Sequence, residues 1–312
     1  MYFSSEELSR ILERCTLVTD TYFPVPWLLT GRLHTRAASI ITPVPSTYER
    51  EILKAPNGST VAIDWFDHPE EVSKKFTGLL LIMNHACNGN TLHLTSAISN
   101  AGRYKLGCCL ITLPGISDLV LSGPNPGFGL SFLVELQAIM DRVNQHVGVH
   151  FPKVSLAFSL GGVPLLEFSS VSPFFSQVYI SLPLNLDLFE SDICLEQAKR
   201  VTKKNSDTIT KTNPTISEIS NLKELRNLFP SSNPIISIES ISRPTLLIYA
   251  LDDESIPFFE TVDLVRLCRN KNIAVATTNA GGHCGFQTVN DTDHETWIVT
   301  ASLEFLASSI LP

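Results

Sequence analysis

The most informative serine of the sequence follows an apolar run and precedes a pair of glycines. Ser159 comes directly after VSLAF at 154–158, and LGG follows at 160–162. A nucleophilic serine on a sharp strand-to-helix turn needs small residues two positions before it and two positions after it. Gly161 meets this need, and Ala157 adds only a methyl group where a glycine is usual. The pattern predicts that Ser159 is a nucleophile.

A serine hydroxyl becomes an effective nucleophile when a histidine accepts its proton and an acid orients that histidine. His283 lies in GGHCG at 281–285, after the last predicted strand, where a loop can reach across the end of a sheet. Asp253 follows the strand before it, and Asp252 is its immediate competitor. Serine, acid and histidine then occur in one of the chain orders known for such triads. We therefore predict a catalytic triad of Ser159, Asp253 and His283.

The elements that must position these residues alternate along the chain. Six short apolar runs predict strands buried on both faces, at 78–84, 106–113, 154–159, 178–183, 245–250 and 273–278. Helical patterns with one apolar face lie at 131–147, 258–268 and 296–306. Upstream, the runs at 51–55 and 60–66 flank a turn sequence at 56–59 and predict a hairpin. The order implies an α/β fold with a doubly wound, mostly parallel sheet and an N-terminal antiparallel hairpin. Its active site is expected at the C-terminal ends of the strands.

Residues 187–240 interrupt this alternation. The segment is polar and rich in serine, threonine and asparagine, and a structureless loop of this length is unusual in a compact domain. We predict a small helical cap inserted between two core strands, with helices near 190–203 and 215–228. The whole chain, 1–312, is then one domain, since its length and its 44% hydrophobic content suffice for one large core.

Several stretches resemble the YheT-like branch of the α/β-hydrolases, which includes embryogenesis-associated proteins and abhydrolase-domain types one to three. The likeness lies in YFPVPWLLTGRLHT at 22–35, RE at 50–51, APNGSTVAIDW at 55–65, FSLGG at 158–162, RPTLL at 243–247, DD at 252–253 and GGHCGF at 281–286. The resemblance implies the α/β-hydrolase fold and a serine esterase or acyltransferase that acts on lipid-like esters. It also implies the same triad roles for Ser159, Asp253 and His283.

Acyl transfer further needs an oxyanion hole, a pair of donors that stabilise the negative oxygen of the tetrahedral intermediate. In this fold one N–H comes from the residue after the nucleophile, and another comes from a loop that follows an earlier strand. We assign these backbone donors to Leu160 and Ala86. The related branch has His-Gly where this chain has Asn84 and His85. The side chain of His85 is therefore expected to narrow the pocket or to shift the hole.

Composition argues against several other functions. The chain carries 31 acidic and 23 basic residues, a formal net charge of −8, which disfavours a nucleic-acid partner. No apolar run predicts a membrane-spanning helix, and the N-terminus lacks the pattern of a signal peptide. Seven scattered cysteines without a C-x-x-C pair fit a reduced compartment, and no cluster has metal-ligand spacing. We expect a cytoplasmic protein without metal or cofactor, whose contact with membranes is at most peripheral.

The leading hypothesis is a serine hydrolase of carboxylic esters that have an apolar, lipid-like acyl group of short to medium length. The first alternative is transfer of the acyl group to an alcohol, because that reaction needs the same acyl-enzyme. The second is a catalytically impaired member of the fold that binds a ligand, which Ala157 and the altered segment 84–85 would favour. The complete triad argues for the enzyme.

Overall fold

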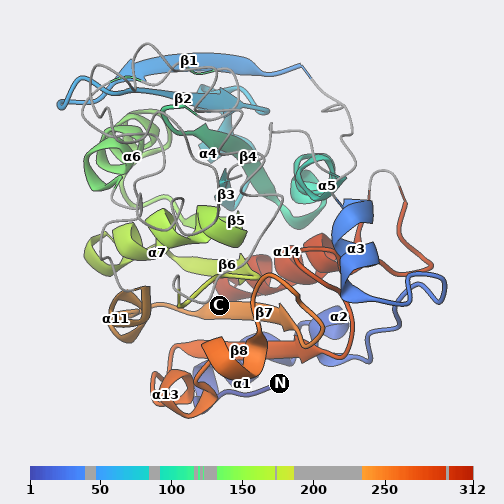
Figure 1. Ribbon diagram of the computed structural model, residues 1–312. Coiled ribbons are helices and arrows are strands. Elements are labelled where there is room, and N and C mark those ends of the chain that lie inside the picture. Colours follow the sequence, from blue (N-terminus) through green and yellow to red (C-terminus); the bar gives the residue numbers. More distant parts are fainter. Residues whose placement is uncertain are drawn as a thin grey trace.

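Eight strands form one mostly parallel sheet at the centre of the molecule (Figure 1). The computed structural model describes residues 1–38, 47–83, 92–115, 119, 122, 132–172, 174–185, 234–292 and 295–311. The strands are β1 (Glu49–Lys54), β2 (Thr60–Trp65), β3 (Gly78–Met83), β4 (Leu106–Thr112), β5 (Lys153–Phe158), β6 (Ser176–Ile180), β7 (Thr245–Ala250) and β8 (Ile273–Thr278). They lie in the order β1-β2-β4-β3-β5-β6-β7-β8. β2 is antiparallel to both β1 and β4, and the other neighbouring pairs are parallel, which confirms the predicted fold.

Burial on both faces explains why the strands have near-continuous apolar sequences. In β3, Leu79 and Leu81 enter one hydrophobic core, while Leu80 and Ile82 enter another on the opposite face. The first core is covered by α4 (Pro69–Lys75), α6 (Leu133–Val147), α7 (Gly162–Val171), α11 (Pro234–Glu239), α12 (Phe258–Thr261) and α13 (Leu264–Cys268). The second is covered by α1 (Glu6–Leu12), α2 (Thr16–Thr19), α5 (Leu92–Asn100), the 3₁₀ turn η1 (Ala101–Tyr104) and α14 (Trp297–Ile310).

The predicted hairpin is present as β1 and β2. Its turn places Gly58 at a φ of 84°, in the left-handed region that glycine adopts without steric cost. The side chain of Asn57 in the same turn donates a hydrogen bond of 2.9 Å to Glu135 on α6. Across the two strands, Arg50 donates two hydrogen bonds to Asp64, at 2.6 and 2.7 Å. These contacts hold the hairpin together and fix it to α6.

The single helix predicted at 258–268 is wrong, because the structure has two short helices there, α12 and α13. Asp263 lies between them, and its side chain accepts a hydrogen bond of 3.0 Å from the N–H of Arg266. This bond caps α13 and starts it as a separate helix. The apolar stripe in the sequence continues through the break and therefore suggested one helix.

Parts of the prediction lie outside the described residues. They include the cap at 187–240 except for 234–240, where α11 lies, and the oxyanion segment at 84–86. The predicted cap helices near 190–203 and 215–228 are among them. Within the described ranges, none of the helices is long and apolar enough to cross a bilayer.

Candidate active site

Ser159 lies on the turn between β5 and α7, at the C-terminal edge of the sheet. A short 3₁₀ turn, η2 (Ser159–Gly161), joins the strand to the helix. Ser159 has a φ of 52°, a left-handed conformation that costs a residue with a side chain about 1–3 kcal/mol. A Cβ on Gly162 would approach the side chains of Leu182 and Tyr179 to 2.6 and 2.9 Å, so a glycine is needed where the helix begins. This backbone has the strained strand–turn–helix geometry of a nucleophile elbow.

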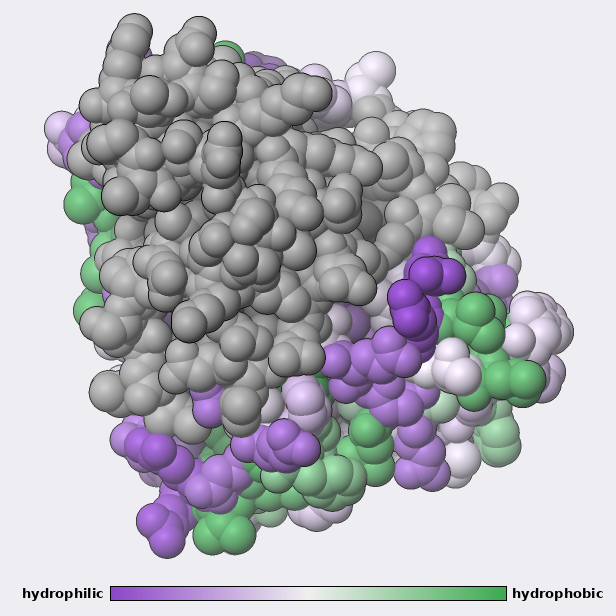
Figure 2. All heavy atoms as spheres, viewed as in Figure 1, coloured by the Kyte–Doolittle hydropathy of each residue, from purple (hydrophilic) through white to green (hydrophobic). Residues whose placement is uncertain are grey.

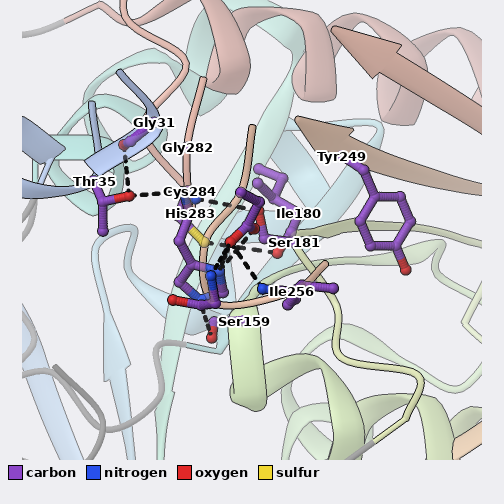
Figure 3. A network of polar contacts seen from close by, with 12 residues as sticks. Gly31, Thr35, Ser159, Ile180, Ser181, Tyr249, Ile256, Gly282, His283 and Cys284 are labelled. Atoms are coloured by element: carbon purple, nitrogen blue, oxygen red, sulfur yellow. Dashed lines mark hydrogen bonds and ion pairs between the residues drawn. The ribbon is translucent and has the colours of Figure 1, made fainter. Parts of the chain in front are cut away.

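The structure brings the three residues of the predicted triad together, and Figure 3 shows Ser159 beside His283. Ser159 Oγ lies 2.6 Å from His283 Nε2. On the other side of the ring, His283 Nδ1 lies 2.9 Å from Asp253 Oδ2 and 3.2 Å from Oδ1. A carboxylate accepts hydrogen bonds, so Nδ1 carries the hydrogen and Nε2 is free to accept the serine proton. His283 and Asp253 are both buried, which shields their hydrogen bond from water.

The two neighbouring acids have different partners. Asp253 Oδ1 accepts hydrogen bonds from the N–H groups of Ser255 and Ile256, at 2.8 and 3.0 Å, which fix the carboxylate toward the imidazole. Asp252 Oδ1 accepts a hydrogen bond of 2.8 Å from the N–H of Gly282. The structure therefore brings Asp253 to the histidine ring and Asp252 to the backbone beside that histidine.

The histidine loop, residues 281–286, has an unusual backbone. Gly282 and Cys284 have φ values of 58° and 59°. A Cβ on Gly282 would lie 2.0 Å from the carbonyl oxygen of Gly31, so no other residue fits there. The N–H of Cys284 donates a hydrogen bond of 3.1 Å to Ser181 Oγ, just beyond the end of β6. The loop thus depends on contacts from distant parts of the chain.

The N-terminal helix α3 (Gly31–Ala38) holds the histidine loop from the other side (Figure 3). Thr35 Oγ1 accepts a hydrogen bond of 2.8 Å from the N–H of His283 and donates one of 2.9 Å to the carbonyl of Gly31. A Cβ on Gly31 would lie 1.9 Å from the carbonyl oxygen of Asp252, so α3 also packs against the acid loop. Sequence reasoning missed Thr35, although this residue ends the signature-like stretch at 22–35 and carries a hydroxyl.

Thr35→Val is expected to slow the reaction of Ser159 with a fluorophosphonate probe by about 10- to 100-fold. Valine has nearly the same shape as threonine, but it cannot accept the hydrogen bond from the N–H of His283. The imidazole would then lose part of its alignment with Ser159. The second-order rate constant of labelling measures this effect.

A matched variant separates the hydrogen bond from the packing of α3. Thr35→Ser keeps the hydroxyl and should restore most of the labelling rate, while the melting temperatures of the valine and serine variants stay within a few degrees of each other. Equal labelling of the valine variant and the wild type would show that Thr35 does not position His283.

A second histidine, His93 on α5, also holds the histidine loop. Its Nε2 lies 2.6 Å from the carbonyl oxygen of Cys284, and its Nδ1 lies 3.1 Å from Thr296 Oγ1. Because a carbonyl only accepts, Nε2 carries the hydrogen and Nδ1 accepts from the threonine hydroxyl. The ring stacks on Phe158 at a centroid distance of 6.0 Å. Burial lowers the pKa of His93 from 6.5 to about 4, so the ring is neutral near pH 7.

The neutral state of His93 predicts a loss of stability in mild acid. In the unfolded chain this histidine takes up a proton near pH 6.5, whereas in the folded protein it stays neutral down to about pH 4. The unfolded state therefore gains the proton first, and stability falls as the pH drops from about 6.5 to about 4. The full difference corresponds to about 3 kcal/mol. Urea unfolding at several pH values should show a flatter profile for His93→Gln than for the wild type, and two parallel profiles would contradict this account.

Of the two predicted oxyanion donors, Leu160 and Ala86, the structure describes Leu160. Leu160 is buried in η2, directly after Ser159 and at the N-terminal end of α7. Backbone N–H groups at a helix N-terminus carry partial positive charge and favour an anion. Ala86 lies outside the described residues.

Comparison with known protein families finds no matching family. Among curated proteins, the chain is 24% identical to Phospholipase ABHD3 of Homo sapiens over 325 residues, which cover 90% of this chain and 77% of that protein. It is also 24% identical to Phospholipase ABHD3 of Mus musculus, over 92% of this chain and 78% of that protein. These relatives are abhydrolase-domain proteins, which confirms the resemblance to the abhydrolase-domain branch.

Solved structures share the fold at low sequence identity. The esterase Pf2001 of Pyrococcus furiosus has a TM-score of 0.54 and 15% identity, over 85% of this chain and 89% of its own. Est1E of Butyrivibrio proteoclasticus, solved with ferulic acid bound, has a TM-score of 0.56 and 14% identity, over 81% of this chain and 96% of its own. These solved structures support the predicted fold, and the phospholipase relatives support the prediction of an esterase- or lipase-type α/β-hydrolase.

Proposed function

We propose that this chain, an α/β-hydrolase similar to abhydrolase-domain phospholipases, hydrolyses carboxylic esters through an acyl-enzyme on Ser159. The observation that carries the proposal is the continuous chain of hydrogen bonds from Ser159 through His283 to Asp253, with Ser159 on a strained turn. Such a chain activates a hydroxyl that would otherwise be a poor nucleophile. Residues held in such strained backbone conformations cluster at active sites, which supports a functional role for this turn.

In the acylation half, Ser159 Oγ attacks the ester carbonyl carbon while its proton passes to His283 Nε2. The carbonyl π electrons move to the oxygen, which the N–H of Leu160 and a second donor, assigned to Ala86, would stabilise. The tetrahedral intermediate then collapses, and the alcohol leaves with the proton from Nε2. Asp253 keeps the Nδ1 hydrogen in place and stabilises the transient imidazolium.

In the second half, a water molecule attacks the acyl-enzyme and gives its proton to His283 Nε2. The new intermediate releases the carboxylic acid, and Ser159 Oγ recovers the proton. An alcohol in place of water would give acyl transfer by the same steps. We favour hydrolysis because the curated relatives reported above are phospholipases.

The substrate class follows from the same relatives. Phospholipase ABHD3 acts, by its name, on phospholipids, and it matches nine-tenths of this chain. We propose a lipid-like ester with an apolar acyl group of short to medium length. In this reaction the triad supplies the nucleophile, the base and the acid in turn.

The experiment that tests the function uses a fluorophosphonate probe, which reacts with an activated serine without the natural substrate. Wild type should be labelled, while Ser159→Ala and His283→Ala should not. Release of fatty acid from p-nitrophenyl esters of increasing length and from phosphatidylcholine then defines the substrate. A folded wild type that neither reacts with the probe nor cleaves any ester would refute the proposal and favour a ligand-binding protein.

A further inference from the structure

Helix α3 has one face buried against the protein and one face exposed to the surroundings. The inner face buries Gly31 and His34 and carries Thr35, which holds the N–H of His283. At 100° per residue, Arg32 and Arg36 project from the opposite side, and both are exposed. One short helix therefore contacts the candidate active site with one side and the surroundings with the other.

The segment before α3 is firmly attached to the protein. The ring of Tyr22 packs on Trp297 at a centroid distance of 4.7 Å, and its hydroxyl donates to the carbonyl of Gln287 at 3.0 Å. The N–H of Val25 donates to the same carbonyl at 3.0 Å, and Pro24 forms an isolated bridge with Thr288. The backbone of 22–25 is thus fixed beside the strand-like stretch that follows the histidine loop.

This attached segment nevertheless exposes large apolar side chains. Phe23 and Trp27 are each 69% exposed, and Leu29 is 82% exposed. Leu33, on α3, adds a fourth apolar side chain beside Arg32. Figure 2 shows hydrophobic and strongly hydrophilic residues side by side toward the right-hand edge of the molecule, where Figure 1 places α3 and the blue chain that precedes it. We call the set Phe23, Trp27, Leu29, Arg32, Leu33 and Arg36 the N-terminal ridge.

We propose that the N-terminal ridge docks the protein on the surface of a phospholipid membrane. Leucine and phenylalanine side chains would enter the acyl boundary, and the indole of Trp27 suits the zone between chains and headgroups. Arginine binds lipid phosphate through its planar fork of donors. Arg32 and Arg36 are both exposed, and no ion pair joins either of them to an acidic side chain among the residues that the structure describes.

The arginines also favour a lipid surface over a purely apolar partner. The chain as a whole is acidic, with a net charge of −8, yet the exposed charges of α3 are both positive. A partner that contacts this ridge must accept apolar groups and cations within one helix turn of each other. The interface of a phospholipid bilayer offers acyl chains and phosphates at this spacing.

The N-terminal ridge lies close to the candidate active site. Because Thr35 on the same helix binds the N–H of His283, a membrane under α3 would lie next to the histidine loop. This inference rests on the proposed function and deepens it, since it names the face of the protein that would contact the lipid surface in which the ester lies. Docking itself needs no chemistry, so it is measured independently of hydrolysis.

The test is co-sedimentation of the full chain with vesicles of phosphatidylcholine alone and of an equimolar mixture with phosphatidylserine. The protein carries Ser159→Ala, so that cleavage cannot alter the vesicles. Trp27→Ser combined with Leu29→Ser should weaken binding more than about tenfold, because two large apolar groups no longer enter the bilayer. Arg32→Gln combined with Arg36→Gln should weaken binding to the mixed vesicles about fivefold for each charge removed. Val149→Ser is the matched control, since Val149 is 71% exposed and precedes β5 at the end opposite Ser159.

Two further readouts make the outcome decisive. In a chain with Ser159 intact, the ridge variants should cleave a water-soluble ester as fast as the wild type and lose activity only on vesicle-bound lipid. Failure of the Ser159→Ala protein to sediment with either vesicle overturns the proposal, and so does equal binding of the ridge variants and Val149→Ser. Dimers in size-exclusion chromatography that disappear in the ridge variants, without any vesicle binding, would assign the ridge to a second copy instead. Vesicle binding without fluorophosphonate labelling would count against the proposed function and leave docking in place.

Discussion

Ser159→Ala is expected to reduce kcat/KM for ester hydrolysis by about 10⁵–10⁶-fold while the protein keeps its fold. The substitution removes the atom that forms the acyl-enzyme and leaves only binding and oxyanion stabilisation. The side chain of Ser159 lies on a turn and contacts His283, so its loss opens no large cavity. Initial rates with a p-nitrophenyl ester and a thermal unfolding curve measure the two halves of this prediction.

Ser159→Gly is the matched control for the strained backbone. Glycine adopts a φ of 52° without the clash of a Cβ, at the cost of a more flexible unfolded chain. The glycine variant should be as inactive as the alanine variant and up to about 1 kcal/mol more stable than it. Residual activity near the wild-type level in either variant would rule out Ser159 as the nucleophile.

Asp253→Asn is expected to reduce kcat by about 10⁴-fold. The oxygen of the asparagine would still accept the N–H groups of Ser255 and Ile256, which turns its NH₂ group toward His283. An NH₂ group cannot accept the Nδ1 hydrogen, so the imidazole would change tautomer and present an N–H to Ser159. The rate at saturating substrate over a range of pH measures the loss.

Asp252→Asn tests whether Asp253, and not the neighbouring Asp252, orients His283. Its amide oxygen can still accept the hydrogen bond from the N–H of Gly282, so the histidine loop should keep its shape. The expected loss in kcat is less than about tenfold, because no ring hydrogen bond depends on Asp252. An equal loss in the two asparagine variants would mean that Asp253 is not the orienting acid.

The strands of the sheet could be predicted because each parallel strand forms a short, continuous run of apolar residues in the sequence. Leu79 to Ile82 alternate between two cores on opposite faces, so each residue of the run must be apolar. The hairpin carried its own turn signal, with Gly58 at the position that needs a left-handed backbone. Helix boundaries were less predictable, as the capping of α13 by Asp263 shows, because one polar residue can break a helix without breaking its apolar stripe.

The candidate triad was predictable for a different reason. Ser159, Asp253 and His283 each follow a recognisable strand, and the parallel sheet brings the C-terminal ends of those strands to one edge. The residues that hold the triad follow no such rule. Thr35, Ser181 and Asp252 each accept a hydrogen bond from the backbone of the histidine loop. A hydroxyl or carboxylate that accepts a hydrogen bond from an N–H far away in the sequence produces no periodic pattern of residues.

The hydrogen bond between Thr35 and His283 joins residues 248 positions apart, which has a consequence for biosynthesis. At about 5–20 residues per second, the ribosome adds His283 roughly 10–50 seconds after Thr35. All eight strands of the sheet are therefore synthesised before helix α3 can make this contact. Contacts of such high sequence separation form late in folding, because the entropy of closing a long loop opposes them. The nascent chain should thus acquire its secondary structure well before it acquires enzymatic activity.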